Sequence, residues 1–104
     1  MPLTREFRET VLQRIAHDAH YREALFSEAL NAFLAGESRV GKAMLRDLVH
    51  GTVGFEGLAS ATGKPSKSLH RMLAPRGNPS TDNFFSIVSA LQKKTRVKLR
   101  VTAA

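Results

Sequence analysis

The chain of 104 residues contains no cysteine, and this absence excludes several kinds of chemistry at once. Without cysteine there is no disulfide framework, no thiol nucleophile and no cysteine-based zinc site, so the protein is compatible with a reducing compartment. No apolar run approaches the roughly 18 residues that span a bilayer, and the N-terminus lacks the basic-then-apolar pattern of a secretory signal. The sequence therefore predicts a cytoplasmic protein that makes no membrane contact.

Patterns typical of catalysis are also missing. The segment from Gly51 to Gly54 is too short for a phosphate-cradling loop, and no Gly-Lys-Ser/Thr run follows it. His17 and His20 are three residues apart, but two histidines without a third ligand usually belong to a polar helix face. No Ser, His and acid trio has flanking residues that indicate an activated nucleophile. We expect neither enzymatic activity nor a metal ion or other cofactor.

Acidic residues are scarce in the second half of the chain. Residues 1–56 contain seven Lys and Arg against eight Asp and Glu, whereas residues 57–104 contain nine Lys and Arg against the single acid Asp82. The net charge of +7 therefore belongs to the second half. Such sign asymmetry is typical of a protein that binds a polyanion, because each neutralised phosphate releases condensed counterions.

The region 54–74 spaces its small and apolar residues as two closely crossing helices require. Ala59 is small enough for a second helix to pass over the first, and Gly63 can adopt the positive φ that ends a helix abruptly. Leu58 and Leu69 are expected to fill the crevice between the helices. This spacing predicts a DNA-reading helix-turn-helix. An αα-hairpin without DNA binding would share the spacing, but the basic charge of this half favours the DNA-reading form.

Basic residues would lie on the outer face of the second helix, which suits a phosphate-lined groove. In helix-turn-helix docking, residues near the N-terminus of the recognition helix and one turn later reach base edges in the major groove. The predicted base contacts are Ser66, Lys67 and Arg71. Arg71 can bind O6 and N7 of guanine together, although a phosphate contact would also suit its charge. The predicted phosphate contacts are Lys64, His70, Arg76, Asn78, Ser80 and Thr81, with surface cover as the alternative role of His70.

Apolar periodicity predicts a mainly α protein of five to six helices that forms a single domain over residues 1–104. Its expected parts are N-terminal helices within 1–51, the helix-turn-helix at 54–74, a closing helix at 80–94 and a C-terminal strand at 96–102. Thr4 and Ser80 are expected to cap helices. The side chains expected to face the core include Phe7, Val40, Phe84, Phe85, Val88 and Leu91.

The segment 96–102 alternates apolar and basic residues, and this period of two predicts a half-buried β-strand. No other segment has a strand pattern, and a lone strand leaves its backbone donors and acceptors unpaired. We therefore expect Val97, Leu99 and Val101 to lie in a dimer contact, where the strand pairs with its own copy about a two-fold axis or with the edge of a partner's sheet. An extended tail laid over the helices is the alternative.

Several short runs resemble those of a known family. Within the helix-turn-helix region they are Leu58-Ala59, Gly63, Leu69, Arg71-Met72-Leu73 and Gly77-Asn78-Pro79. Outside it they are Thr4-Arg5-Glu6-Phe7, Gly41-Lys42, Leu45-Arg46-Asp47 and Gly54-Phe55. These runs are similar to phage-repressor-like (Xre/Cro) helix-turn-helix regulators, and more narrowly to small bacterial antidote (antitoxin) proteins of addiction modules. The resemblance implies a homodimeric repressor of its own operon that also binds and neutralises a cognate toxin.

Pro65 departs from the pattern of that family, which usually places Ser or Thr at the start of the recognition helix. Proline has a fixed φ and no N–H, so it suits a helix start. We expect Ser66 to cap the helix one position late. This departure leaves open which residue makes the first base contact.

Three functions are consistent with the sequence. The first is a sequence-specific regulator that binds double-stranded DNA as a homodimer. The second is a protein-interaction module that neutralises a toxin, with DNA binding secondary, and the long N-terminal helices favour it. The third is a non-specific basic DNA binder, whose affinity would depend on salt and not on sequence. RNA is the least suited partner, because there are no exposed aromatic pairs on which splayed bases could stack.

Overall fold

The computed structural model describes residues 4–104, and these residues form six α-helices. The helices are α1 (Arg5–His17), α2 (Ala19–Leu34), α3 (Ser38–Gly51), α4 (Gly54–Thr62), α5 (Ser66–Met72) and α6 (Thr81–Thr95). The prediction of a mainly α protein is therefore confirmed. None of these helices is both long enough and apolar enough to span a bilayer.

Side-chain caps explain where several helices begin. The N–H of Phe7 donates to Oγ1 of Thr4 at 3.0 Å, and the N–H of Tyr21 donates to a carboxylate oxygen of Asp18 at 3.0 Å. This second hydrogen bond holds the pKa of the Asp18 carboxyl below its usual value, because it favours the charged form. Ser80 caps α6 in the same way at 3.2 Å. The predicted caps Thr4 and Ser80 are thus confirmed.

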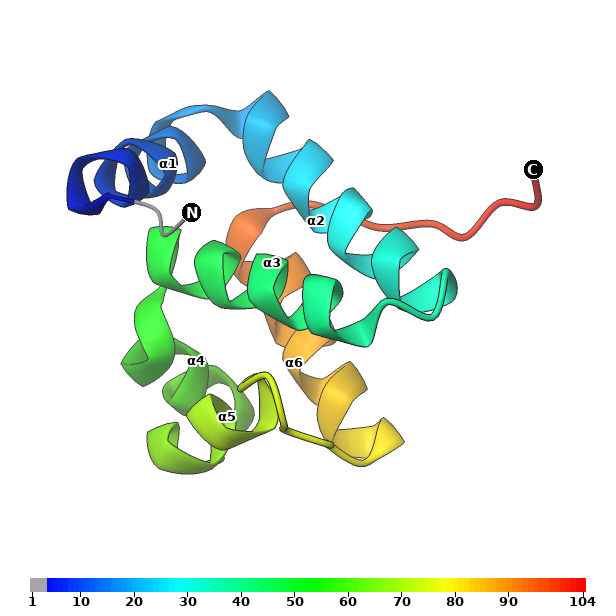
Figure 1. The fold of residues 1–104 in the computed structure, drawn as a ribbon. Helices are drawn as coiled ribbons and strands as arrows, with labels where there is room; N and C mark the ends of the chain where they lie inside the picture. The colour runs from blue at the N-terminus through cyan, green and yellow to red at the C-terminus, as the bar shows by residue number, and fades with distance from the viewer. Residues whose placement is uncertain (1–3) are drawn as a thin grey trace.

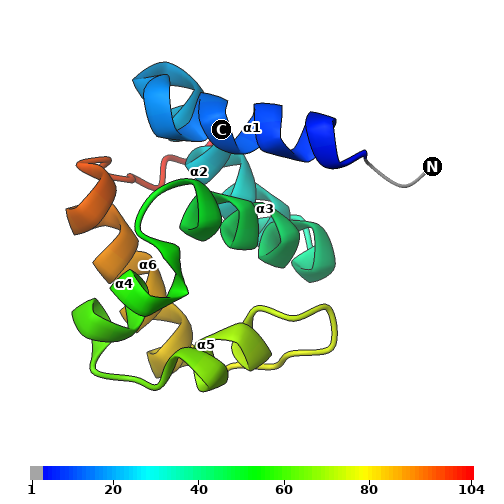
Figure 2. The ribbon, with the colours of Figure 1, turned by 90° about the vertical axis from the view of Figure 1, so that its left-hand side faces the viewer.

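Helix α3 lies at the centre of the molecule (Figure 1). Helices α1 and α2 pack against it and against each other, α4 follows from its C-terminal end, and α5 and α6 both pack on α4. Figure 2 shows α1 and α5 at opposite ends of the molecule. The two N-terminal helices therefore support α3 from the side that is remote from α5.

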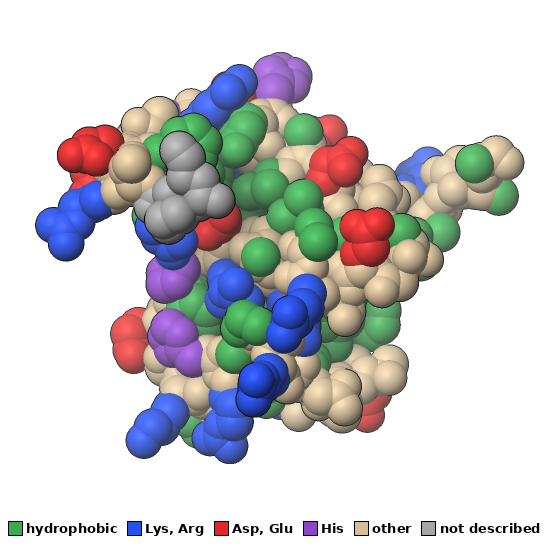
Figure 3. Space-filling model, in the orientation of Figure 1, with side chains coloured by type: hydrophobic (Ala, Val, Ile, Leu, Met, Phe, Trp, Pro, Cys, Tyr) green, Lys and Arg blue, Asp and Glu red, His purple; other side chains and the backbone are tan. Residues whose placement is uncertain are grey.

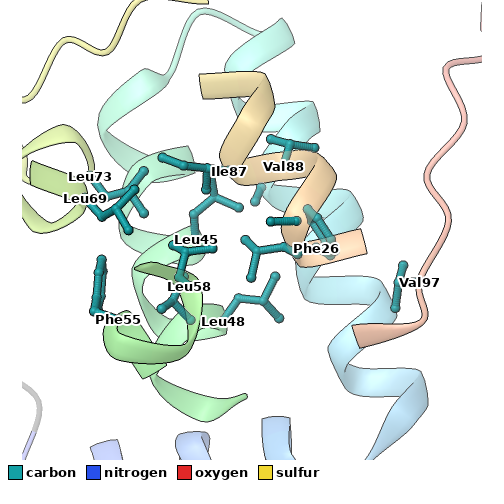
Figure 4. Close-up of a cluster of buried hydrophobic side chains, with 14 of the residues drawn as sticks. Phe26, Leu45, Leu48, Phe55, Leu58, Leu69, Leu73, Ile87, Val88 and Val97 are labelled. Carbon is teal, nitrogen blue, oxygen red and sulfur yellow. The ribbon is translucent and has the colours of Figure 1, made fainter. Parts of the chain in front are cut away.

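All six helices contribute to one hydrophobic core (Figure 4). The fully buried large side chains are Ile15, Phe26, Leu45, Leu48, Val49, Leu58, Leu69, Leu73, Ile87 and Leu91. Three residues that were expected to face this core do not do so. Phe7, Val40 and Phe85 are 52%, 44% and 54% exposed. In α6 the helical period places 84, 87, 88 and 91 on one side, so Ile87 takes the inward position that was predicted for Phe85.

The β-strand predicted at 96–102 is wrong, because no strand occurs in the described part of the chain. Helix α6 ends where Arg96 adopts a left-handed conformation with φ of 58°, and an extended tail of residues 97–104 follows and ends beyond α2 (Figure 1). Val97 is buried in the core, and the N–H of Leu99 donates to Oε1 of Gln92 at 2.8 Å. The first two apolar residues of the alternation, Val97 and Leu99, face this chain's own helices, whereas Val101 is exposed. Extended backbone with that pattern does not require a neighbouring strand.

Candidate nucleic-acid interface

Helices α4 and α5 are joined by the three-residue turn 63–65. Gly63 adopts a left-handed conformation with φ of 71°, and its N–H donates to the carbonyl oxygen of Ala59 at 2.9 Å, which closes α4. Pro65 is extended at φ −61° and ψ 138°, and α5 begins at Ser66. The expected capping role of Ser66 is wrong, because Pro65 occupies the cap position and no side chain caps the helix. The left-handed glycine that was predicted to end the first of the two helices is confirmed.

One side of α5 is fixed by the core. Leu69 is fully buried against the molecule, together with Leu58 of α4 and Leu73 just after α5. Ala59 and Met72 are partly buried and pack against the same cluster. Because one face of this short helix is held inward, the residues at the other helical positions must point to solvent. The outer face of α5 is therefore a consequence of the apolar spacing seen in the sequence.

The three predicted base-contact residues lie on or beside that outer face. Ser66 is the first residue of α5 and is partly buried, whereas Lys67 and Arg71 are exposed and one helical turn apart. Within residues 4–104, neither cation forms an ion pair. Their charged groups are consequently available to a ligand.

His70 lies within α5, and the other predicted phosphate-contact residues lie before or after this helix in the chain. Lys64 is half-buried in the turn before α5, and Arg76 and Asn78 are exposed in the turn after it. Ser80 and Thr81 are exposed at the start of α6, where the backbone N–H groups and the helix dipole favour an anion. Lys64 therefore lies before α5 in the chain and Arg76 and Asn78 lie after it, whereas Ser80 and Thr81 lie further along at the start of α6.

Positive charge gathers over this face of the molecule. Figure 3 shows Lys, Arg and His side chains around α5 and the adjoining part of α3, and acidic side chains more often over α1 and α2. The ion pairs among residues 4–104 join Arg8 to Asp47 and Arg14 to Asp18, each at 3.5 Å. Both pairs lie in the N-terminal half, so the cations around α5 keep an uncompensated field that attracts polyanions.

His70 packs on an aromatic ring and is exposed at its other side. Its imidazole stacks on Phe55 of α4 with the centroids 3.8 Å apart and the planes 18° apart. His50, at the end of α3, meets the same phenyl ring edge-on at 5.1 Å. Burial lowers the pKa of His50, and the neighbouring Arg8 and His70 act in the same direction. The stack joins the end of α3, the start of α4 and α5.

Two residues important for this face were not found by sequence reasoning. Lys42 of α3 is only 6% exposed, and its Nζ donates to the carbonyl oxygens of Pro75 at 3.1 Å and Gly77 at 2.6 Å. Arg46, one turn later, donates to the carbonyl oxygen of Leu73. The sequence feature that could have indicated the role of Lys42 is the occurrence of a lysine among the core-facing positions of a helix. Its acceptors are 33 and 35 residues away, so local spacing could not identify them.

The predicted dimer residues are not equivalent in the structure. Val97 is 8% exposed and Leu99 is half-buried, so both already pack on this chain, whereas Val101 is 85% exposed. Val101 lies at the rim of a groove between α2, α6 and the tail. The apolar residues that line the groove are Leu30, Phe33, Leu34, Phe84, Phe85, Val88, Leu99 and Val101. The strand-mediated dimer contact expected at these three residues is not supported, because Val97 and Leu99 pack on this chain's own helices.

Comparison of the chain with protein-family models, with curated proteins and with solved structures found no match. A short basic helix is held by its apolar side, the half-buried Lys64 lies before it, and the exposed Arg76 and Asn78 follow it. Such an arrangement can place one helix into a groove between two rows of phosphates.

Proposed function

We propose that this protein is a sequence-specific regulator that binds double-stranded DNA and reads the major groove with α5. The observation that carries this proposal is the position of Lys67 and Arg71, exposed one turn apart directly opposite the buried Leu69. A guanidinium at the position of Arg71 can donate to O6 and N7 of guanine, which is worth about 1–3 kcal/mol of discrimination between bases. Lys67 lies nearer the helix N-terminus, where base contacts are usual.

Phosphate contacts would set the position of α5 in the groove. Lys64 precedes the helix, and Arg76 and Asn78 follow it, so donors at both ends can bind phosphates on the two sides of the groove. The start of α6 at Thr81 adds a helix N-terminus. These contacts carry no sequence information but orient the residues that do.

A fluorescence-anisotropy titration tests this proposal. The protein is titrated at physiological salt with the duplex immediately upstream of its own coding sequence and with a shuffled duplex of the same composition. A specific autoregulator prefers the native duplex by a factor of about a thousand or more. Equal, salt-sensitive binding to both duplexes would instead indicate a non-specific basic binder.

A homodimer completes the proposal, because two recognition helices related by a two-fold axis would meet successive major grooves about 34 Å apart. The surface that supports such a dimer is the groove between α2 and α6 with the exposed Leu34, Phe85 and Val101 at its borders. A second copy about a two-fold axis would place each Val101 against the partner's apolar groove. Exposed apolar side chains gathered in one place are typical of such contacts.

The resemblance to antidote proteins favours a second role, in which the protein binds and neutralises a toxin. The supporting observation is that α1 lies at the opposite end of the molecule from α5, so a protein could bind α1 without covering α5 (Figure 2). Co-expression with the product of the neighbouring gene, followed by co-purification through a tag on one partner only, tests this role. A one-to-one or two-to-two complex that still binds the upstream duplex is the expected result. Failure of the two products to co-purify would remove the toxin-binding role and leave the regulator.

A further inference from the structure

The turn that follows α5, residues 73–79, is bound by two cations from α3. Lys42 donates to the carbonyl oxygens of Pro75 and Gly77, and Arg46 donates to the carbonyl oxygen of Leu73. Cations near the C-terminal end of a helix are favourable, because the unpaired carbonyls there carry partial negative charge. The position of the turn is thus fixed from α3 as well as from α5.

Lys42 has no acidic partner in the described part of the chain. The ion pairs among residues 4–104 involve Arg8 and Arg14 as cations. A buried ammonium group is costly unless it is well hydrogen-bonded, and here the bonds are made by two backbone carbonyls. A leucine at this position of the core-facing stripe would avoid that cost. We therefore attribute the presence of a buried lysine at position 42 to its hydrogen bonds with the turn, which fix the direction of two carbonyl groups.

The two carbonyls that face Lys42 determine where the next two amide groups point. In a trans peptide, the carbonyl of one residue and the N–H of the next point in opposite directions, and no peptide bond described here is cis. Because the carbonyls of Pro75 and Gly77 point inward to Lys42, the N–H groups of Arg76 and Asn78 point away from it. Neither N–H has a hydrogen-bond acceptor among residues 4–104, and both residues are exposed.

We propose that Lys42 is a positioning residue that orients the backbone N–H groups of Arg76 and Asn78 to bind a phosphate of the DNA backbone. This inference rests on the proposed function and specifies how one of its phosphate contacts is built. The buried charge of Lys42 lies on the inner side of the same peptide groups and adds a field that favours an anion on their outer side.

The side chains at these positions extend the same contact. Arg76 adds a guanidinium and Asn78 adds an amide, so charged and neutral donors are available beside the two backbone N–H groups. The turn also packs directly against the end of α5, because a Cβ atom at Gly77 would overlap the carbonyl oxygens of Arg71 and Met72. A phosphate bound by the turn would consequently set the depth and direction of α5 in the groove.

The wild-type protein provides the first test, by ¹⁵N–¹H NMR. The labelled protein is titrated with a short duplex of random sequence and, separately, with inorganic phosphate. The expected result is that the amide signals of Arg76 and Asn78 shift with both ligands, and that the amides of α5 shift with the duplex. If the α5 amides shift with the duplex while those of Arg76 and Asn78 do not, the inference is overturned and the proposed function stands. If the duplex shifts neither group, both are overturned.

The variant Lys42→Met provides the second test, with Lys93→Met as a control that removes the same charge from an exposed position in the last turn of α6. Loss of two amide contacts is expected to weaken duplex binding by about tenfold, equally for the native and the shuffled duplex. The amides of Arg76 and Asn78 should no longer shift with phosphate, and the amides of α5 should still shift with duplex. Unchanged phosphate shifts in Lys42→Met would contradict the inference. If Lys42 had only a structural role, its replacement would perturb the amide signals of α5 as much as those of the turn.

Discussion

At the scale of single residues, two glycines shape the two ends of α5 for different physical reasons. Gly63 needs a left-handed backbone, and a Cβ atom there would meet nothing within 4 Å. Gly77 has no positive φ, but a Cβ atom there would overlap backbone atoms of Arg71 and Met72. A side chain at position 63 would cause only local backbone strain. A side chain at position 77 would overlap backbone atoms and would therefore displace the whole turn from α5.

We therefore predict different losses for alanine at the two positions. Gly63→Ala should cost about 1–2 kcal/mol of unfolding free energy, the usual penalty for a left-handed residue with a side chain. Gly77→Ala should cost more, about 3 kcal/mol, because no change of rotamer relieves the overlap. Urea denaturation of the two variants measures both values. Equal losses would contradict the close contact between the turn and α5.

His50 makes stability depend on pH. Burial lowers its pKa in the folded protein, so the folded state binds this proton less readily than the unfolded chain. The free energy of unfolding should therefore fall as the pH drops below about 6.5, the ordinary value for histidine, and level off below the lowered value in the fold. The effect should be small because His50 is partly exposed.

The variant His50→Gln should lose this part of the pH dependence. Urea midpoints of wild type and variant, measured between pH 7.5 and 5, make the comparison, and the difference between the two proteins isolates His50 from the other histidines. The wild type should lose more stability than the variant on acidification. Parallel curves for the two proteins would show that the environment of His50 does not disfavour its charged form.

At the scale of elements, local signals in the sequence predicted some features well and missed others. The turn between α4 and α5 was predictable because Gly63 and Ala59 act within a few residues of each other. The tail was not, since alternation of Val97, Leu99 and Val101 is the same for a strand and for an extended segment that packs on its own helices. The role of Lys42 was also hidden, because a basic residue on an apolar helix face does not reveal its distant partners.

The groove between α2 and α6 leads to a prediction about assembly. Phe85 borders this groove, and Phe7 of α1 is almost equally exposed elsewhere, at 52% against 54%. Replacing Phe85 by Asp should convert a dimer into a monomer, because it places a charge in an apolar contact. Phe7→Asp is the matched control and should leave the dimer intact. Since both side chains are largely exposed, neither variant should lose much thermal stability.

Sedimentation velocity gives the masses for this comparison. A dimeric mass for the wild type and Phe7→Asp, with a monomeric mass for Phe85→Asp, is the expected outcome. A wild-type monomer, or a Phe85→Asp dimer, would remove the groove as the dimer contact. The tail must be kept in these experiments, because Val97 belongs to the core and its deletion would unfold part of the chain.

At the scale of the whole molecule, the charge asymmetry of the sequence divides between two regions. Four of the nine cations after residue 57 are in the helix-turn-helix and its following turn, namely Lys64, Lys67, Arg71 and Arg76. The other five are in the last turn of α6 and the tail, namely Lys93, Lys94, Arg96, Lys98 and Arg100. The sequence therefore predicted a basic half and a basic face on α5, but it could not say whether the cations of α6 and its tail share that face, because that depends on how α6 and its tail pack.

Because the cations lie in two regions, the effect of net charge on DNA binding can be measured separately from the effect of the cations on α5. The variant Lys67→Ala/Arg71→Ala removes two charges from α5, and Lys93→Ala/Lys94→Ala removes two from the end of α6. If general attraction of a basic protein to DNA were the whole effect, the two variants would bind equally weakly. If α5 enters the groove, only the first loses contacts made with the bases.

The most direct measurement of the central proposal is a fluorescence-anisotropy titration of wild type and both double variants with the native upstream duplex at physiological salt. We predict a loss of about a hundredfold or more for the α5 variant, as expected when about 3 kcal/mol of contacts are removed, and a much smaller loss for the α6 variant. The α5 variant should also lose its preference for the native over the shuffled duplex. Equal losses in the two variants, with the preference retained, would contradict the assignment of α5 as the element that reads DNA.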